Sequence, residues 1–478
     1  MEKFFQLKAA GSNVRTEIIA GLTTFFTMAY IIIVNPHLLG QAGVPFNGVF
    51  VATILASAIG TLMLSLFAKL PYAQAPGMGL NAFFVFTVCF GMGFQWQEAL
   101  AMVLICGVVG MIITATGLRK SIIKSIPKFM QNAIGGGIGL FIAYIGVKNS
   151  NFIFFNVDPG TYTDVGGGSL SVNATAVPAL ITFNDKLALV ALFGLILTLI
   201  LLFFKVKGAI FIGIIVTAIF SIPMGVMDVS FLKNNPVFDL SAIGGIKDTF
   251  GACFGNPGLL SLFTSLNKTL LALAAIFAFI LTDVFDTIGT FLGTGRVSGI
   301  FDENDEKMLF ESKGFKSKME KGLFADLTAT FTGAILGTSN VTTYVESAAG
   351  IASGGRTGLT SLVVAILFLL FLPFANLVYL IPNQATSAAL IVVGVMMAGS
   401  FADIKWREFE EAAPAFMTVA FMTFAYSITY GIAAGFITYT ITKLCKRQIK
   451  QVHPILIGVA CLFVLNFLIF ALRGAGVF

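Results

Sequence analysis

The sequence predicts an all-α polytopic membrane protein with fourteen transmembrane elements, arranged as two inverted repeats of seven. Three observations support this fold class. Of the 478 residues, 57% are hydrophobic and only 11% are charged. Apolar runs of about 20 residues, the length that crosses a bilayer core, recur along the chain. Residues 70–84 and 338–356 are too rich in Gly, Pro, Ser and Thr for regular helices, and irregular backbone at membrane depth needs protein or water around it.

Charge and motifs argue against several other classes of protein. The net charge is +6, but the Lys and Arg residues gather in short links between apolar runs, as cytoplasmic loops require, so we expect no nucleic-acid partner. The five cysteines are scattered without a CxxC pair, which disfavours a disulfide framework and a zinc site. The sequence carries no catalytic motif and no metal-ligand cluster, so it indicates neither an enzyme nor a cofactor.

The first half contains seven predicted elements. The first helix is expected to end at Asn35-Pro36, because proline disrupts a helix interior. The third element is broken, since Pro71, Pro76 and Gly77 prevent a regular helix, and the fifth is rich in glycine. The predicted elements are 18–34, 49–68, 70–84, 99–117, a helix from 131, 187–204 and 209–224.

The second half contains the other seven. Residues 296–321 form the most charged stretch of the chain and are predicted to be a cytoplasmic loop, whereas the loops 149–185 and 225–268 are predicted to face outward. The predicted elements are 269–293, 324–336, 338–356, 362–380, 385–399, 414–428 and 431–444.

The two halves align over their broken segments. Residues 57–77 match residues 330–350, so that Gly60 corresponds to Gly333. Seven elements separate equivalent points, and an odd number inverts the second half in the membrane. Inverted repeats with paired broken segments indicate a transporter whose site lies near the membrane midplane.

The basic links predict the orientation in the membrane. With a cytoplasmic N-terminus, the links after the fourth, sixth, eighth and twelfth elements lie inside, and each of these links carries Lys or Arg. We therefore expect a multi-pass protein of the cytoplasmic membrane. A further apolar run, 454–472, either crosses the membrane again or lies against the bundle or the interface, and the sequence leaves these alternatives open.

Glu346 is the strongest candidate for a functional residue. It lies inside the second broken segment, and no Lys or Arg occurs between Lys321 and Arg356 to form a structural ion pair with it. A charged side chain at the bilayer centre costs at least about 2.5 kcal/mol, so such residues usually have a function. The sequence therefore places Glu346 in a substrate site.

Asp283 and Asp286 are the next candidates. They lie three residues apart in the predicted helix 269–293, roughly on one face with Thr287. Asn81 follows the first break and is either a site residue or a local cap. Supporting positions are Asp286, Thr287, Gly77, Gly79, Thr343, Tyr344 and Gly350. The glycines allow either close approach of a substrate or close packing of helices.

Four motifs carry a resemblance to a known family. They are APGMGLNAFF at 75–84, TDVFDTIGT at 282–290, TSNVTTYVESAAGIASGGRTG at 338–358 and VHPI at 452–455. With these motifs the chain resembles the AzgA-like adenine/guanine/hypoxanthine permeases, a branch of the nucleobase–cation symporters. The resemblance covers nearly the whole chain.

The resemblance implies the uracil-permease fold, with a core domain and a gate domain. The core would comprise 1–128 and 269–380, and the gate 129–268 and 381–450, followed by the hydrophobic segment 451–478. The resemblance also implies proton-coupled purine uptake by an elevator-type motion. Carried over by motif, the substrate contacts are Asn81, Asp283 and Glu346.

The chemistry of two carboxylates favours oxopurines. Guanine presents two adjacent donors, N1–H and the 2-amino group, and a carboxylate accepts both through charge-assisted hydrogen bonds. Two nearby carboxylates in a low dielectric also favour protonation of one of them. We therefore expect Glu346 to bind guanine or hypoxanthine and Asp283 to carry the coupling proton, with Glu346 as a second proton-coupling candidate.

Three alternatives remain at this stage. One is an adenine-preferring permease of the same family. Another is an anion transporter of the same fold, which the acidic candidates disfavour, and the third is a channel. The sequence also leaves open the exact set of purines, the proton stoichiometry and whether the chain forms a homodimer.

Overall fold

The computed structural model of the protein describes residues 2–116, 126–156, 162–166, 169–172, 177–233, 235–291, 299–301, 317–454, 456–461, 463–464 and 467. Parts of the sequence interpretation therefore lie outside the described residues. These are the basic residues Arg119, Lys120 and Lys124, most of the charged loop 296–321, and the end of the last hydrophobic run.

All fourteen predicted elements are found among the described residues. Those of the first half are α2 (Val14–Met28) with α3 (Ile31–Gln41), α4 (Phe46–Met63) with η1 (Leu64–Ala68), β1 (Gln74–Pro76) with α5 (Met78–Ala82) and η2 (Phe83–Gly91), α6 (Trp96–Thr116), α8 (Lys128–Asn149), α9 (Lys186–Phe203) and α10 (Ala209–Ser221). Those of the second half are α11 (Leu266–Thr290), α13 (Lys318–Leu336), β6 (Val341–Thr343) with α14 (Ser347–Ala352), α15 (Gly358–Leu370) with α16 (Ala375–Leu380), α17 (Asn383–Met397), α18 (Phe409–Phe424) and α19 (Ile428–Cys445). Within the described part of the chain, eight helices are long and apolar enough to cross a membrane. The polytopic helical fold class is thus confirmed.

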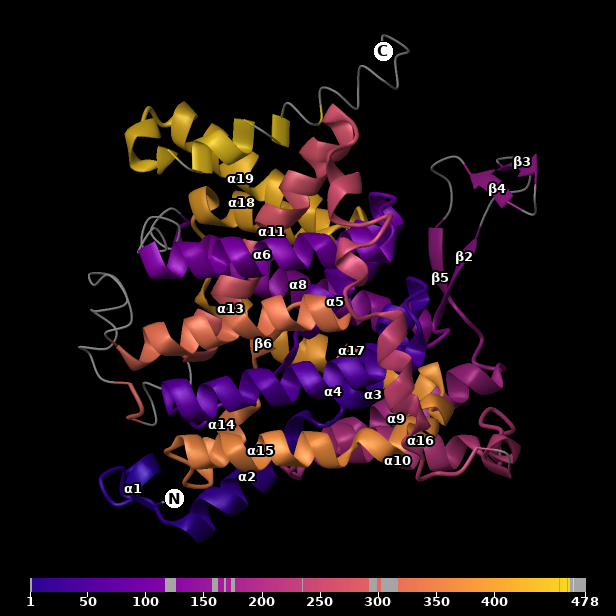
Figure 1. The fold of residues 1–478 in the computed structure, drawn as a ribbon. Helices are drawn as coiled ribbons and strands as arrows, with labels where there is room; N and C mark the ends of the chain where they lie inside the picture. Colours follow the sequence, from indigo (N-terminus) through magenta and orange to yellow (C-terminus); the bar gives the residue numbers. More distant parts are fainter. Residues whose placement is uncertain are drawn as a thin grey trace.

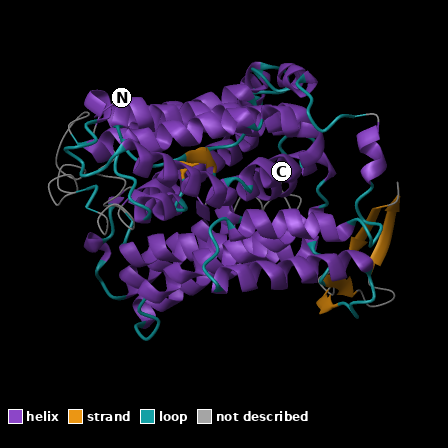
Figure 2. Ribbon diagram, turned by 90° about the horizontal axis from the view of Figure 1, so that it is seen from below, coloured by secondary structure: helices purple, strands orange, loops and turns teal. Residues whose placement is uncertain are grey.

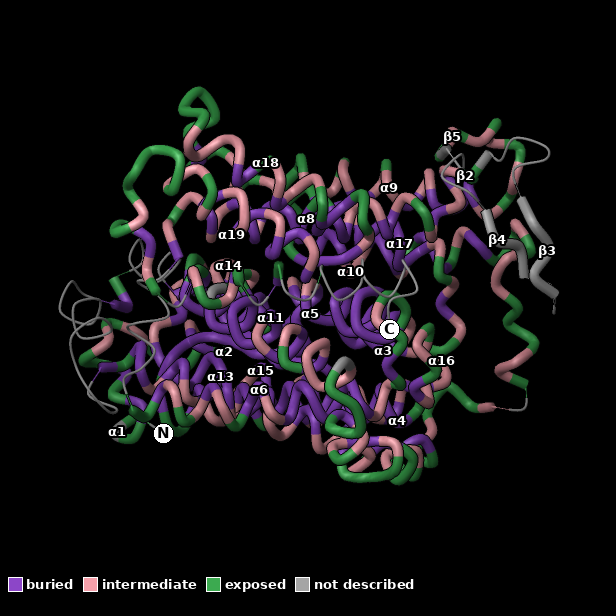
Figure 3. Tube along the Cα trace, turned by 90° about the horizontal axis from the view of Figure 1, so that it is seen from above, coloured by how far each residue is buried: buried purple, intermediate pink, exposed green. Residues whose placement is uncertain are grey.

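The helices run side by side (Figure 1), and their packing divides them into two sets. In the first set, α4, α6, α13, α15 and α2 pack on one another, and in the second, α8, α9, α17, α18 and α19 do so. Figure 3 shows the two sets on opposite sides of the molecule, with α5, α11 and α14 between them. Buried residues line the interior where the sets meet, as the burial colours show. The broken elements therefore lie at the boundary between the sets.

The loops predicted to face outward contain regular structure of their own. The first holds two strand pairs, β2 (Ile153–Asn156) with β5 (Val177–Leu180) and β3 (Tyr162–Gly166) with β4 (Ser169–Val172). These pairs project from one end of the bundle, opposite the N-terminus (Figure 1). The second loop holds short 3₁₀ helices, of which η4 (Ser241–Asp248) packs on α4 and η6 (Leu259–Phe263) on α6 and α11. Part of this second loop thus packs on the first set of helices.

The first membrane helix does not end at Asn35-Pro36 as predicted. It continues through Pro36 as α3 to Gln41. The His37 ring nitrogen Nδ1 lies 2.8 Å from the Ile33 carbonyl oxygen, and Asn35 donates hydrogen bonds to Thr53 at 2.7 Å and Thr338 at 2.9 Å. Proline is tolerated inside a membrane helix where side chains form hydrogen bonds with the backbone groups that it leaves unpaired.

The two halves place equivalent glycines in equivalent surroundings. A Cβ on Gly60 would lie 2.5 Å from Gln74 Oε1 in β1, and one on Gly333 would lie 2.9 Å from a Val341 methyl in β6. Each glycine thus lets its own helix approach the broken strand of its own half. The structure supports the alignment of the halves at this pair.

The C-terminal segment packs along α19. Its buried residues Leu456, Ala460 and Phe463 share a helical spacing, and the Phe467 ring lies 5.6 Å from the ring of Tyr430. Tyr430 lies in the first turn of α19, whereas the segment begins just after the last turn. The segment therefore runs back along the length of α19. Among the alternatives that the sequence left open, this favours a further crossing of the membrane.

Candidate functional site

The two broken segments complete each other. Strands β1 and β6 pair antiparallel, with Gln74 opposite Thr343 and Pro76 opposite Val341. Figure 2 shows strands drawn inside the helical body. Backbone groups without partners are costly in an apolar interior, and pairing satisfies them in both segments at once.

Threonines of the preceding helices lie within hydrogen-bonding distance of the backbone amide and carbonyl of the first residue in each strand. The Gln74 amide donates to Thr61 Oγ1 at 3.0 Å, and the Thr61 hydroxyl lies 3.2 Å from the Gln74 carbonyl. In the other half, the Val341 amide donates to Thr330 Oγ1 at 3.2 Å, and the Thr330 hydroxyl lies 3.0 Å from the Val341 carbonyl. The strand pair is thereby held rigidly between α4 and α13.

Glu346 lies where β6 leads into the short helix α14, and it is partly exposed. The Tyr30 hydroxyl donates a hydrogen bond of 2.8 Å to its Oε1. The ring of Tyr344 lies 6.4 Å from that of Tyr30, and its hydroxyl donates to the Pro76 carbonyl at 2.6 Å. Two tyrosines thus flank the carboxylate, and Tyr30 orients it.

Asp286, rather than Asp283, accompanies Glu346. Asp286 is exposed in the described structure, and it lies close enough to Glu346 and to Thr342 of β6 to interact electrostatically with both. Glu346, Asp286, Tyr30 and Tyr344 therefore form one acidic and aromatic cluster at the break, which we call the acidic cluster.

Asp283 is completely buried behind the strand pair. Its Oδ2 accepts hydrogen bonds from Thr330 Oγ1 at 3.0 Å and Asn340 Nδ2 at 3.1 Å, and Cys106 Sγ lies 3.9 Å away. Its Oδ1 has no hydrogen-bond partner among the described residues. The structure thus places Asp283 against α6 and α13, whereas the acidic cluster lies at the break.

Asp326 of α13 is a second buried carboxylate, which sequence reasoning missed. Its Oδ1 accepts hydrogen bonds from Thr343 Oγ1 at 2.8 Å and Gln74 Nε2 at 3.2 Å, so it binds both strands across one register pair. Among the described residues, no Lys or Arg forms an ion pair with Asp283 or Asp326. The sequence feature that could have revealed Asp326 is its position as a carboxylate inside the apolar stretch 324–336.

The other predicted positions support the break. Asn81 is buried and accepts a hydrogen bond from the Ser339 hydroxyl, and its Nδ2 has no partner among the described residues. The Thr343 amide donates to Thr287 Oγ1 at 3.4 Å. Asn81 thus joins the two broken segments, and Thr287 fixes β6 to α11.

The three predicted glycines allow close packing around the site. A Cβ on Gly77 would lie 2.8 Å from Thr342 Oγ1, and one on Gly79 would lie 2.6 Å from a methyl of Ile138 in α8. A Cβ on Gly350 would lie 2.0 Å from Thr24 Oγ1. Of these contacts, Gly79 with Ile138 joins the first broken element to α8 of the second set.

A buried carboxylate of α2, Glu17, fixes the chain beyond α14. It accepts hydrogen bonds from the Arg356 amide at 3.0 Å, the Thr360 amide at 3.2 Å and the Thr360 hydroxyl at 2.6 Å. Thr360 lies in the first turn of α15, whose first N–H groups lack partners within the helix, and Arg356 lies just before that helix. Sequence reasoning missed this residue as well.

Comparison with known proteins identifies the family. A model described as "Permease family" (Xan_ur_permease) matches residues 15–434. The chain belongs to this permease family. The protein is therefore a multi-pass membrane transporter and not an enzyme, as the sequence predicted.

Three relatives align along nearly their whole length. The permease is 42% identical over 467 residues to the protein MJ0326 of Methanocaldococcus jannaschii, covering 98% of each chain. It is 38% identical to the guanine/hypoxanthine permease PbuG of Bacillus subtilis, covering 98% of this chain and 99% of the relative. It is 36% identical to the adenine permease AdeP of Escherichia coli, covering 98% and 95%.

Solved structures show the same fold at low sequence identity. The transmembrane domain of the cyanobacterial bicarbonate transporter BicA matches with a TM-score of 0.56 at 13% identity, covering 88% of the permease and 97% of that chain. At this identity the likeness shows the fold alone.

Proposed function

We propose that this permease takes up purine nucleobases across the cell membrane, with guanine and hypoxanthine as the main substrates. The proposal rests on relatives named for guanine/hypoxanthine and for adenine that align over nearly the whole chain. The observation that carries it is the acidic cluster, where Glu346 and Asp286 present carboxylate oxygens at the break between paired strands.

The acidic cluster suits the edge of an oxopurine. Guanine offers N1–H and a 2-amino group side by side, and a carboxylate accepts both. Hypoxanthine retains the N1–H donor. Because Tyr30 already donates to Glu346 Oε1, this carboxylate is oriented before a substrate arrives. The nearby rings of Tyr30 and Tyr344 add apolar surface for a flat base.

The buried carboxylates Asp283 and Asp326 are the proposed proton carriers. A buried carboxylate without a cationic partner is costly while it is charged, and binding a proton removes that cost. Both lie directly behind the strand pair that carries the acidic cluster. Protonation there can alter the bonds that hold β1 and β6, and this links the proton to the substrate site.

The second candidate function is adenine uptake. The 36% identity with an adenine permease supports it. Adenine presents an acceptor at N1 beside a donor at N6, and a protonated Glu346 would match that pattern whereas a carboxylate would not. The acidic cluster disfavours an anion as substrate, because like charges repel.

Uptake of labelled bases tests the proposed function. The permease is expressed in cells that lack their own nucleobase permeases, and uptake of guanine, hypoxanthine, adenine, xanthine and uracil is measured at two external pH values. We expect guanine and hypoxanthine to enter fastest, and faster at the lower pH because protons accompany them. Exclusive uptake of uracil, or of none of the five bases, would contradict the proposal.

We further propose that the first set of helices, including the broken elements, moves against the second set. The predicted core domain, 1–128 with 269–380, corresponds to the first set, and the predicted gate domain, 129–268 with 381–450, contains the second. The close contact of Gly79 with Ile138 lies on the surface that such a movement would change. The packing of Ser241–Phe263 on α4 and α6 suggests that this stretch moves with the core.

The proposed orientation puts the N-terminus in the cytoplasm. In a variant without its native cysteines, Lys247→Cys is expected to react with an impermeant thiol reagent added to intact cells, because the loop 225–268 faces outward. Lys405→Cys is expected to react only after the membrane is opened. Both positions are exposed in the structure, so burial does not account for a difference. Labelling of position 405 in intact cells would reverse the proposed orientation.

A further inference from the structure

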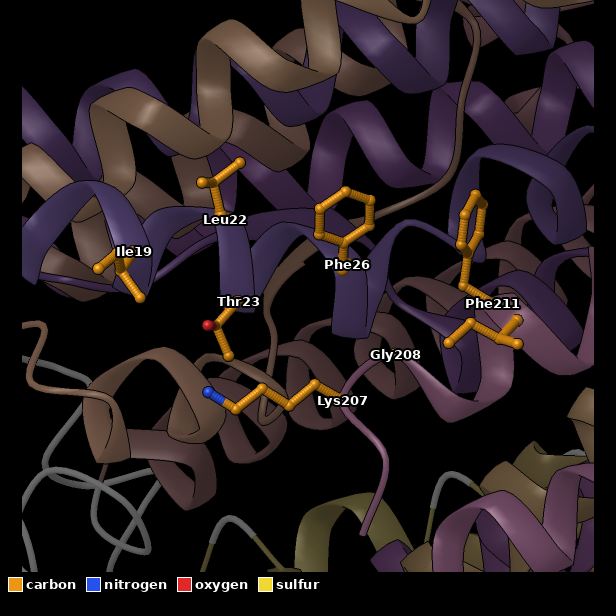
Figure 4. A pocket seen from close by; sticks show the side chains of 8 residues that line it. Ile19, Leu22, Thr23, Phe26, Lys207, Gly208 and Phe211 are labelled. Carbon is orange, nitrogen blue, oxygen red and sulfur yellow. The ribbon is translucent and has the colours of Figure 1, made fainter. Parts of the chain in front are cut away.

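A cavity of about 340 Å³ lies between α2 and the start of α10. Its lining residues are Ile19, Leu22, Thr23, Phe26, Lys207, Gly208, Phe211 and Ile212, and none of the predicted site residues is among them. Its volume falls within the range of about 300–1,000 Å³ that is typical of ligand pockets. Figure 4 shows these side chains around the cavity.

The cavity is apolar along its wall and cationic at one edge. Ile19, Leu22 and Phe26 are 46%, 37% and 45% exposed, so this face of α2 is open to the surroundings of the bundle. Lys207, in the link between α9 and α10, supplies the only charge among the lining residues. Its ammonium donates to Ser353 Oγ at 3.0 Å, and no described carboxylate forms an ion pair with it.

We propose that this cavity binds an anionic phospholipid, with an acyl chain against Ile19, Leu22 and Phe26 and the phosphate on the Lys207 ammonium. An open apolar groove on a membrane protein is surrounded by acyl chains. The single charge in the lining selects a negative headgroup. Lys207 belongs to a link predicted to be cytoplasmic, and the cytoplasmic leaflet carries the anionic lipids.

The bound lipid contacts both sets of helices. Ile19, Leu22 and Phe26 belong to α2 in the first set, and Phe211 belongs to α10, which packs on α9 and α17 of the second. Ser353, the hydrogen-bond partner of Lys207, directly follows α14, the short helix that begins after Glu346. The lipid phosphate would replace this serine hydroxyl as the partner of the Lys207 ammonium. Occupancy of the lipid site would then depend on the relative position of the two sets of helices.

The test measures lipid-dependent thermal stability of the purified full-length permease in detergent, with phosphatidylglycerol and phosphatidylcholine titrated separately. We expect phosphatidylglycerol to stabilise the protein at lower concentrations than phosphatidylcholine. Lys207→Gln is expected to weaken the phosphatidylglycerol effect about fivefold, since one Lys near an anionic headgroup contributes about 1 kcal/mol and 1.4 kcal/mol corresponds to tenfold. Lys205→Gln, two residues away and outside the cavity lining, is the matched control and is expected to retain the full effect.

Two further variants keep the test decisive. Leu22→Trp fills the groove without changing charge and is expected to reduce the phosphatidylglycerol effect. Ser353→Ala removes the competing hydroxyl and is expected to leave the effect intact or strengthen it, whereas a purely structural role of Lys207 would make this variant resemble Lys207→Gln. Equal effects of Lys205→Gln and Lys207→Gln, or equal stabilisation of the wild type by both lipids, would overturn the proposal. Equal stabilisation by a free fatty acid, lost in Lys207→Gln, would overturn the assignment to a phospholipid.

Discussion

Glu346→Gln is expected to abolish high-affinity guanine uptake while leaving the permease folded in the membrane. The amide retains one oxygen that can accept the hydrogen bond from Tyr30, so the local structure survives. It replaces the other oxygen with a donor, which opposes the donors of guanine. Hydrogen bonds to charged groups contribute about 1.5–3 kcal/mol each, so losing one of them should weaken guanine binding by roughly 10- to 100-fold.

Initial rates of labelled guanine uptake over a range of concentrations measure this effect, with the amount of permease in the membrane determined in parallel. Val345→Ala is the matched control, because Val345 is adjacent to Glu346 and its side chain is 51% exposed. The adenine-to-guanine uptake ratio should rise in Glu346→Gln, since an amide offers the donor and acceptor that adenine requires. A wild-type KM for guanine in well-expressed Glu346→Gln protein would remove Glu346 from the proposed site.

Asp283→Asn is expected to uncouple purine transport from the proton. The asparagine has the shape of a protonated aspartic acid, and its oxygen can still accept from Thr330 and Asn340. Its amide nitrogen would occupy the position of Oδ1, which has no hydrogen-bond partner among the described residues. Purine binding should persist, since Glu346 is unchanged, but accumulation against a gradient should be lost.

Reconstituted vesicles separate the two activities. In Asp283→Asn vesicles we expect exchange of purine for purine to continue, while concentrative uptake driven by an inward proton gradient falls to the level seen with a protonophore. Cys106→Ser is a suitable control, because the native Cys106 Sγ lies 3.9 Å from Asp283 Oδ2 and serine keeps a hydrogen-bonding side chain there without altering the carboxylate. Accumulation at the wild-type rate in Asp283→Asn would show that the proton uses another group, and Asp326 is then the nearest alternative behind the strands, with Asp286 after it.

The broken elements were predictable because their causes are local. Pro71, Pro76 and Gly77 exclude a regular helix wherever the chain folds, and the polar run before Glu346 excludes a simple lipid-facing helix. Their pairing was not predicted. The antiparallel register of Gln74 with Thr343 depends on how two helical hairpins, far apart in the sequence, are brought together.

Asp283 and Asp286 show the limit of reasoning from one helix. Three residues apart on α11, they lie on roughly the same face, and a motif alone assigned the site to Asp283. The structure covers Asp283 with Thr330 and Asn340 and leaves Asp286 beside Glu346. The two side chains leave α11 in similar directions around the helix axis. Only the neighbouring elements decide which of them remains accessible.

By itself, the sequence determined the membrane class, the fourteen elements, the two breaks and the importance of a carboxylate at position 346. These follow from hydrophobic run length, from proline and glycine, and from the cost of a charge in the bilayer, all of which act within a short stretch of chain. The tertiary structure alone decided that Tyr30 orients Glu346, that Asp326 joins the strands, and that Glu17 binds the start of α15. Each of these contacts links residues from different elements, and a buried polar group acquires its role only from the partners that folding places beside it.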